Sequence, residues 1–421
     1  MKLCAVLIVI TFTAYAQDMV TIENGKFIRN GEPYYYLGTN FWYGMHLGAL
    51  DTARLTRELD RLQHLGITNL RVMASSEGAD TDPWRVQPSL QTAPGEYNED
   101  LLRGLDYLLY EMSKRDMLAV MCLNNFWPWS GGMAQYVNWA THEPIPYPPP
   151  AENGSWGKYQ RYSARFYSNK EALRFYQDHV KKMVNRTNSL TGIVYKDDPT
   201  IMSWQLANEP EGANNVKAYR KWIKLAARFI RSEDKNHLIS IGSEGNTASS
   251  WAGTNFRKDH QVKWVDYCTM HIWVQNWGWY DPQGGAKALE KARNKAEKYL
   301  LDHLEIANKL KKPMVLEEFG MSRDKDDHSP SSGVSHRDDY YTFLFETAKR
   351  LVLSGNNMSG VNFWAWGGEG RPRVPKAIWK QGDDLIGDPP HEYQGWYSVY
   401  DTDSSTLEII KRYANEMNDI K

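Results

Sequence analysis

Cysteine is scarce in this sequence. Its 421 residues include three cysteines, Cys4, Cys122 and Cys268, which are too few for a small scaffold held together by disulfides, and none has the CxxC spacing of a zinc site. Cys122 and Cys268 lie in apolar runs that are typical of buried strands far apart in the predicted strand order. Since the Cα atoms of a disulfide must lie within ~7 Å of each other, we expect two buried free thiols.

A long apolar run and a net charge are also absent. No segment approaches the ~20 apolar residues of a membrane-spanning helix. The 50 Lys and Arg residues nearly balance the 51 Asp and Glu residues, so no long-range field favours nucleic acid or anionic lipid. We therefore expect a monomer that binds neither nucleic acid nor a membrane.

The first residues have the pattern of a secretory signal. Lys2 gives a positive start, an apolar run covers residues 3–12, and Ala14-Tyr15-Ala16 has the small-x-small pattern of a cleavage site. We expect residues 1–16 to be a signal peptide. Residues 17–421 are then expected to form a single domain that is secreted, either extracellular or periplasmic.

Short apolar strands alternate with amphipathic helices after the first 33 residues, the pattern of a parallel sheet with helical crossovers. Strands are predicted over residues 34–38, 69–73, 119–123, 201–206, 238–241, 267–270, 314–316 and 360–363. Helices are predicted over residues 52–65, 99–113, 170–184, 216–230, 286–310, 338–353 and 405–417. Eight strands with helices between them predict the α/β class and a (β/α)8 TIM barrel. The fifth crossover, residues 242–264, shows little helical periodicity.

An N-terminal β-hairpin is predicted before the barrel. Two strand-like stretches in residues 20–28 flank Asn24-Gly25, a dipeptide that favours tight hairpin turns. Asn30-Gly31 marks a second reversal of the chain. Such a hairpin could plug the floor of the barrel.

Three segments that follow predicted strands are too long for simple connections: residues 74–97, 125–169 and 365–401. They all lie at carboxyl ends of strands, the face on which barrel enzymes build their active sites. The chain also has 17 Trp and 25 Tyr residues, and several Trp lie in the second segment. Aromatic faces stack on the C–H faces of sugar rings as well as fill a core, so these long loops point to a carbohydrate site.

Two glutamates follow the fourth and seventh predicted strands, Glu209 and Glu318. Glycoside hydrolysis needs one carboxyl that protonates the leaving oxygen and another that attacks or activates water, and retaining enzymes hold them ~5–5.5 Å apart. Both glutamates would emerge at the same rim. Glu317 is a rival of Glu318, but neighbouring side chains of a strand point to opposite faces, so we predict that Glu318 is the catalytic residue.

The segments around these glutamates resemble the acid/base and nucleophile motifs of glycoside hydrolase family 5. They read Trp204-Gln205-Leu206-Ala207-Asn208-Glu209-Pro210 and Val315-Leu316-Glu317-Glu318-Phe319-Gly320. The resemblance implies a retaining glycosidase with Glu209 as acid/base, Glu318 as nucleophile, and no metal or organic cofactor. Such a mechanism needs Glu209 protonated and Glu318 ionised, so we expect their surroundings to push the two pKa values apart.

Four further residues stand at positions to which the resemblance assigns a role. Arg71 would bond the nucleophile and keep it ionised, and Asn208 would bond the 2-hydroxyl of the sugar being cleaved. His271 would orient the catalytic group or the sugar, and Trp364 would form the floor beneath the ring, with Trp366 as a competitor. Taken singly they could be a rim ion pair, a turn residue, a core histidine and a core tryptophan.

The third strand and its flank resemble the mannanase branch, often assigned to subfamily 7. The matching residues are Leu123-Asn124-Asn125-Phe126-Trp127, Gly131-Gly132-Met133, Tyr136 and Trp139, with Gly38-Thr39-Asn40 and Gly242-Ser243-Glu244-Gly245 elsewhere. The resemblance implies a retaining endo-β-1,4-mannanase acting on mannan, glucomannan or galactomannan. Asn125 and Glu244 then become candidate substrate contacts, although each could instead cap a loop.

Two residues depart from the family pattern. His271-Ile272-Trp273 stands where His-x-Tyr is usual, so the hydroxyl expected beside the nucleophile is missing unless the indole N–H of Trp273 replaces it as donor. Glu211 stands where fungal mannanases commonly have Arg after Asn-Glu-Pro. The reversed charge could weaken the leaving-group subsite or change the products.

Other activities remain open. The same chemistry could serve an exo-acting β-mannosidase, if a long loop narrows the cleft to a pocket, or a β-1,4-glucanase. A barrel that only binds glycans is the alternative from another class, but such barrels normally lose a catalytic carboxylate, and this chain keeps both.

Overall fold

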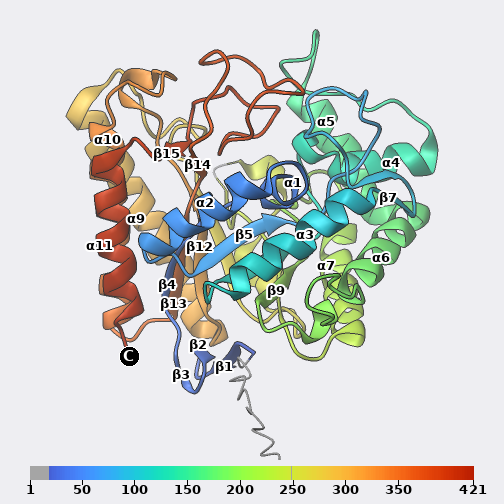
Figure 1. Cartoon of the computed structure of the whole chain (residues 1–421), viewed down its shortest axis with the longest axis horizontal. Coiled ribbons are helices and arrows are strands. Elements are labelled where there is room, and N and C mark those ends of the chain that lie inside the picture. The colour runs from blue at the N-terminus through green and yellow to red at the C-terminus, as the bar shows by residue number, and fades with distance from the viewer. Residues whose placement is uncertain (1–18, 248) are drawn as a thin grey trace, which may run out of the picture.

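The computed structural model describes residues 19–247 and 249–421, and its centre is a sheet of eight parallel strands (Figure 1). Their order is β10-β9-β8-β5-β4-β13-β12-β11. The strands are β4 (Tyr36–Asn40), β5 (Asn69–Met73), β8 (Leu118–Cys122), β9 (Ile201–Gln205), β10 (Leu238–Ser240), β11 (Cys268–Ile272), β12 (Met314–Phe319) and β13 (Met358–Phe363). Backbone hydrogen bonds from Asp266 to Ile239 (2.8 Å) and from His271 to Glu244 (3.1 Å) join the two ends. The sheet thus closes on itself, and the predicted (β/α)8 barrel is confirmed.

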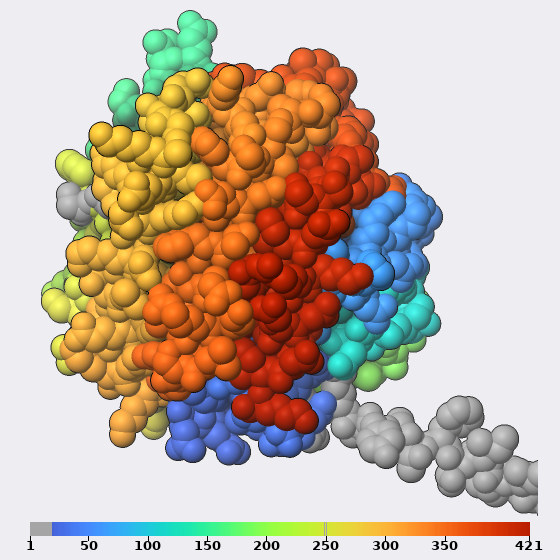
Figure 2. Space-filling view, turned by 90° about the vertical axis from the view of Figure 1, so that its left-hand side faces the viewer, coloured from blue at the N-terminus to red at the C-terminus, as the bar shows by residue number. Residues whose placement is uncertain are grey.

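Helices surround this barrel. The main ones are α2 (Thr52–His64), α3 (Glu99–Ser113), α6 (Lys170–Val184), α7 (Val216–Glu233), α9 (Gly285–Leu310), α10 (Ser335–Leu353) and α11 (Ser404–Asn418). Figure 2 shows α9, α10 and α11 side by side on one flank. The described residues of the fifth crossover, 242–247 and 249–264, form only a single-turn η4 (Ser250–Ala252) and the short α8 (Phe256–His260), in agreement with its weak periodicity.

The N-terminal hairpin gains a third strand and closes one end of the barrel. It consists of β1 (Thr21–Glu23), β2 (Lys26–Arg29) and β3 (Glu32–Pro33), and it lies opposite the long loops in Figure 1. Asn24 and Gly25 both have positive φ, 51° and 75°, as tight hairpin turns require. Phe27 is fully buried and packs its ring edge-on against Tyr267, with 5.2 Å between ring centroids. The hairpin therefore covers a small apolar layer at the barrel floor.

The three long segments at the other end are more ordered than simple loops. The first contains the small hairpin β6 (Gln91–Ala93) and β7 (Glu96–Tyr97). The second contains η1 (Pro128–Ser130), α4 (Gly132–Thr141), α5 (Trp156–Ser163) and η2 (Ala164–Ser168). The third contains β14 (Trp366–Gly368) and β15 (Val399–Tyr400). The remaining elements are α1 (Gly44–Leu50), η3 (Tyr195–Asp197) and η5 (Asp324–Asp326).

The thiols of Cys122 and Cys268 are buried and free, as predicted. Cys4 and the predicted signal peptide lie outside the described residues. Within residues 19–247 and 249–421, no helix combines the length and the apolar character that crossing a membrane requires.

Candidate active site

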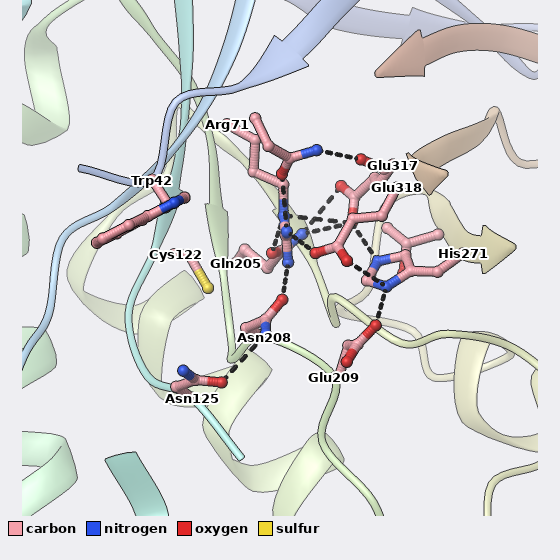
Figure 3. Close-up of polar contacts among 12 residues, drawn as sticks. Trp42, Arg71, Cys122, Asn125, Gln205, Asn208, Glu209, His271, Glu317 and Glu318 are labelled. Atoms are coloured by element: carbon pink, nitrogen blue, oxygen red, sulfur yellow. Dashed lines mark hydrogen bonds and ion pairs between the residues drawn. The ribbon is translucent and has the colours of Figure 1, made fainter. Parts of the chain in front are cut away.

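Glu209 and Glu318 meet at the carboxyl end of the barrel (Figure 3). Glu318 lies near the end of β12, and Glu209 lies four residues beyond β9. Glu209 has a φ of 47°, in the left-handed region that non-glycine residues rarely adopt. Its backbone N–H donates to Gly242 O at 2.8 Å, which holds this turn in place. One oxygen of each carboxyl and a ring nitrogen of His271 all lie within 4.8 Å of one another.

The carboxylate of Glu318 is paired with the guanidinium of Arg71 through Nη1. The same guanidinium donates from Nε to Gln205 Oε1 (2.8 Å), from Nη1 to Asn40 Oδ1 (3.0 Å) and from Nη2 to Asn208 Oδ1 (2.7 Å). Because each of its nitrogens has an acceptor, Arg71 is fixed in one orientation. Its positive charge therefore stays directly against Glu318.

Glu317 does not point away from the site, contrary to the expectation from strand alternation. Both of its oxygens accept from Gln205 Nε2, at 2.9 and 2.8 Å, and one lies 3.7 Å from Arg71 Nε. Glu318 lines the cavity above the barrel, whereas Glu317 is buried within the polar layer beneath it. The pairing of β11 with β12 shifts register between Met270 and His271, so simple alternation fails here.

Glu209 accepts three hydrogen bonds from ring N–H groups. His271 Nδ1 lies 2.6 Å from Oε1, Trp273 Nε1 lies 3.2 Å from Oε1, and Trp127 Nε1 donates to Oε2. The indole of Trp273 therefore donates to Glu209 and not to Glu318, so it does not replace the hydroxyl expected beside the nucleophile. His271 also lies 3.3 Å from Glu318, so it bridges the two glutamates.

The pKa values of these three groups are tied together. Burial lowers the pKa of His271, but the charge of Glu318 and the hydrogen bond to Glu209 outweigh burial and raise it to about 9. Burial would raise the pKa of Glu209, yet the hydrogen bond and charge of His271 turn the shift downward. Burial raises the pKa of Glu318 to about 7 despite the nearby positive charges of His271 and Arg71. The raised pKa of His271 favours its protonated ring, and the pKa values of the two glutamates shift in directions opposite to those expected.

The same three residues have the spacing of a metal site. Arg71 already pairs with Glu318, however, and a second cation there would be repelled. The raised pKa of His271 favours the protonated ring, which cannot bind a metal. The cluster is better suited to hold a proton than a metal ion.

Asn208 lines the cavity and is held from two sides. Its Oδ1 accepts from Arg71, and its Nδ2 donates to Asn125 Oδ1 at 3.1 Å. Asn125 is fully buried, and its Nδ2 donates to Ser130 Oγ at 3.1 Å. Asn125 therefore supports Asn208 from behind the cavity wall, and a direct contact of Asn125 with substrate stays a prediction.

Trp364 and Trp366 are clearly separated in the structure. Trp364 lines the cavity beside Trp273, with ring centroids 5.9 Å apart, and its indole N–H has no partner among the described residues. Trp366 is buried in the core, where its N–H donates to Glu58 Oε2 at 3.0 Å. Trp364 is thus the tryptophan available as a floor for a sugar ring.

The cavity above the glutamates has a volume of about 540 Å³ and a strongly aromatic lining. Its aromatic residues are Trp127, Trp129, Trp156, Trp273, Trp277, Trp364, Tyr393 and Trp396. The second and third long segments meet at its edge, where His391 Nε2 lies 2.7 Å from Pro149 O. The rings of Trp156 and His391 are also in contact, with centroids 5.2 Å apart. One side of the cavity is therefore walled by two loops that are far apart in sequence.

Glu211 and Glu244 also line the cavity. Glu211 accepts from Gln160 Nε2 at 2.8 Å. Glu244 follows β10, and its backbone carbonyl accepts from Tyr299 OH at 2.8 Å. The position expected to weaken a leaving-group subsite is thus part of the cavity, next to the acid/base candidate.

Sequence reasoning missed several residues of this site. Gln205 connects Arg71 with Glu317, and Trp127 donates to Glu209. Gln205 could have been found from the sequence, because it lies two residues after Ser203 on β9 and so points to the same side of the strand, into the barrel. A polar side chain inside a barrel needs a hydrogen-bond partner. The wall residues of the third long segment gave no such signal, because they follow no regular period.

Three comparisons agree with this geometry. The family model described as GH family 5 beta-mannosidase-like matches residues 17–421. Mannan endo-1,4-beta-mannosidase 4 of Solanum lycopersicum is 30% identical over 367 residues, which cover 84% of each chain. A glycoside hydrolase family 5 mannosidase from Rhizomucor miehei has a TM-score of 0.87 and 42% identity, covering 95% of this chain and 97% of that chain. A mutant of that mannosidase has been solved in complex with mannosyl-fructose. An endo-beta-1,4-mannanase from Thermotoga petrophila shares the fold, with a TM-score of 0.69 at 24% identity, covering 93% of this chain and 78% of that chain.

Proposed function

Because this chain belongs to glycoside hydrolase family 5, in its β-mannosidase-like group, we propose that it is a retaining endo-β-1,4-mannanase. Its substrates would be the internal β-1,4-mannosidic bonds of mannan, glucomannan or galactomannan. The proposal depends above all on the closeness of Glu209 and Glu318, whose nearest oxygens lie within 4.8 Å. Inverting enzymes hold their two carboxyls ~6.5–9.5 Å apart to admit a water, so this spacing supports retention.

Hydrolysis proceeds in two displacements. A carboxylate oxygen of Glu318 attacks the anomeric carbon, and the bond to the leaving oxygen breaks as Glu209 gives that oxygen a proton. Glu209 then removes a proton from water, whose oxygen attacks the same carbon and releases Glu318. Two inversions restore the original configuration.

His271 supplies the proton that Glu209 needs. The ring nitrogen lies 2.6 Å from the carboxylate, and its raised pKa of about 9 keeps a proton there in neutral solution. Transfer along this short hydrogen bond converts Glu209 to the acid when the leaving oxygen arrives. Glu318 gains its nucleophilic form from Arg71, whose charge favours the ionised carboxylate.

The other site residues position the sugar. Asn208 is fixed by Arg71 and Asn125 with its amide at the cavity wall, where it can bond the 2-hydroxyl. Trp364 forms the floor, and its free N–H can donate to a sugar oxygen. Trp273 and Glu244 complete the contacts with substrate. A mannose-containing substrate is supported by the names of the tomato relative and of the Rhizomucor miehei mannosidase.

Exo-acting removal of terminal mannose is the second candidate function. The observation that favours it is the wall in which the ring of His391 is hydrogen-bonded to Pro149 O and contacts the ring of Trp156. The ring centroid of Trp156 in turn lies 5.5 Å from that of Trp127. Trp127 donates to Glu209, so the wall begins at the catalytic pair. If it ends the cleft just beyond the cleaved sugar, only a terminal mannose can enter.

Products from mannohexaose labelled at the reducing end test both functions. Endo cleavage releases labelled di-, tri- and tetrasaccharides from the start, whereas exo cleavage releases mannose and labelled mannopentaose. Proton NMR of the first product gives the anomeric configuration, and cellohexaose tests glucan cleavage. Glu318→Ala should abolish turnover, while Glu290→Ala, an exposed glutamate of α9, should not. Full activity in Glu318→Ala or net inversion would disprove the mechanism.

Export is part of the proposal. Residues 1–16 have the signal-peptide pattern described above, and a mannan-degrading enzyme meets its polymer outside the cell. N-terminal sequencing of the secreted protein should begin near Gln17. Retention of residues 1–16 in the mature protein would contradict this.

A further inference from the structure

The cavity contains more carboxyl groups than the two displacements use. Besides Glu209 and Glu318, the side chains of Glu211, Glu244 and Glu392 line it. Buried carboxyls normally have a hydrogen-bond donor or a cation as partner, because desolvating a charge is costly. An extra carboxyl without such a partner therefore indicates that a donor or cation is supplied by the bound ligand.

Glu244, like Glu392, has a carboxyl group without a hydrogen-bond or ion-pair partner among the described residues, and it follows β10, the neighbour of the strand that precedes Glu209. Its residue is 7% exposed and lines the cavity, and no hydrogen bond or ion pair reaches its carboxyl group from any other described residue. Burial raises its pKa well above the usual range, and the charges of Glu209 and Glu211 raise it further. The backbone carbonyl of Glu244 accepts from the backbone N–H of His271 and from Tyr299 OH.

Glu211 has a single neutral donor, Gln160 Nε2 at 2.8 Å. Burial raises the pKa of Glu211 to about 8, and the charge of Glu209 contributes. In residues 19–247 and 249–421, no lysine, arginine or histidine forms an ion pair with Glu211 or Glu244. The positive charges near the cavity, Arg71 and His271, are already paired with Glu318 and Glu209.

These two carboxyls lie on the leaving-group side of the cavity. Glu211 follows β9 and Glu244 follows β10, which are neighbouring strands, and Glu209 N–H to Gly242 O joins their loops. The leaving oxygen must contact Glu209 to receive its proton, so the sugar attached to that oxygen extends past Glu209 and away from Glu318. Glu211 and Glu244 therefore face the leaving sugar.

We propose that this side of the cavity binds a leaving sugar that carries a protonated amino group, such as a 2-amino-2-deoxyhexose, with Glu211 and Glu244 as its counterions. The inference deepens the proposed glycosidase function and rests on it. A cation beside the two carboxyls favours their ionised form and supplies the charge-assisted hydrogen bonds that they lack. A hydroxyl in the same place gives only weaker neutral hydrogen bonds.

Two disaccharides test this inference, β-mannosyl-1,4-glucosamine and β-mannosyl-1,4-glucose, compared at a mildly acidic pH that protonates the amine. The enzyme should cleave the first with a kcat/KM about tenfold higher, a difference of ~1.4 kcal/mol. In the double variant Glu211→Gln/Glu244→Gln the ratio should fall close to one. Glu290→Gln removes one exposed glutamate charge elsewhere and should keep the wild-type ratio.

Equal kcat/KM values in the wild type, or an amine preference that persists in the double variant, would overturn the inference. If the double variant does not fold, Glu244→Gln alone should reduce the preference. If the folded wild type cleaves neither disaccharide, the proposed function still stands or falls with the mannohexaose assay, because an endo-acting enzyme cleaves longer chains, and calorimetric titration decides the inference by itself. Glucosamine should then bind more tightly than glucose and lose this advantage in the variants, and equal binding of the two sugars would refute it.

Discussion

Arg71→Met is the substitution that tests the electrostatic reasoning most directly. It removes the guanidinium that is paired with Glu318 and leaves a side chain of similar length. The nucleophile must be ionised, so the acidic limb of the pH–activity profile reports the pKa of Glu318. Burial already raises that pKa to about 7, with Arg71 acting against the rise. Removing the positive charge therefore moves the acidic limb to higher pH.

The size of the effect follows from the distance between the charges. Two unit charges ~4 Å apart interact by about 4 kcal/mol at an effective dielectric constant of ~20, which corresponds to about 3 pKa units. At neutral pH the ionised fraction of Glu318, and with it kcat/KM, should fall roughly 100- to 1000-fold. Two buried carboxylates, Glu317 and Glu318, also lose their cation, which should cost about 3–5 kcal/mol of folding free energy.

The assay is kcat/KM on a manno-oligosaccharide across pH, combined with urea unfolding at each pH. Activity of Arg71→Met should recover as the pH rises, until the limb set by His271 near pH 9 is reached. Arg186→Met is the matched control, because Arg186 is also buried and pairs with Asp106 at 2.6 Å, outside the cavity lining. It should lower stability without moving the limb. An unmoved acidic limb in folded Arg71→Met would refute the reasoning.

The other predictions concern the proton supply and the cavity wall. His271→Asn removes the proton donor of Glu209, so the alkaline limb of the pH–activity profile should move to lower pH. The value of kcat should fall more than KM changes. The same series of kcat/KM measurements across pH checks both results. The pKa of His271 is raised to about 9 in the folded protein, so its protonation contributes roughly 3 kcal/mol to the free energy of unfolding. This contribution is complete below pH ~6.5 and is lost as the pH rises through about 9. Urea unfolding should detect this loss in the wild type and not in His271→Asn. Trp273→Phe removes the indole N–H that lies 3.2 Å from Glu209. Because one hydrogen bond to a charged group contributes ~1.5 kcal/mol, kcat should fall about tenfold. An unchanged kcat would mean that this hydrogen bond is unimportant for catalysis. The carboxylate of Asp388 accepts hydrogen bonds from Gly395 N (3.0 Å), Tyr397 N (2.6 Å) and Ser398 Oγ (2.5 Å). The substitution Asp388→Asn should therefore loosen residues 386–398, which should raise KM and speed proteolysis in this segment. An unchanged proteolytic cleavage pattern would contradict this prediction.

The limits of two helices were predicted to the residue. α3 and α6 begin and end at the predicted residues, and in both an asparagine, Asn98 or Asn169, accepts from backbone N–H groups of the first turn. α4, whose N-cap Gly131 offers no side-chain acceptor, was missed, and so was α5, although the side chain of Ser155 caps its start. The first strand was placed two residues early, because Tyr34 and Tyr35 extend its apolar run toward the hairpin.

The sequence by itself determined the barrel and brought the two proposed catalytic glutamates to the same face. Strand and helix periods are local properties, and parallel connections bring all strand carboxyl ends to one face. Glu209 and Glu318 could therefore be placed together from their positions after the fourth and seventh strands.

Only the tertiary structure decided what each side chain contacts. A register shift turns Glu317 into the polar layer below the cavity, Trp273 donates to Glu209 and not to Glu318, and Asn125 lies behind Asn208. The proton on His271 depends on two glutamates from different strands, and the wall depends on the bond from His391 to Pro149, 242 residues apart in sequence. Such contacts join residues that no local pattern relates, so their geometry and their pKa shifts appear only when the barrel closes.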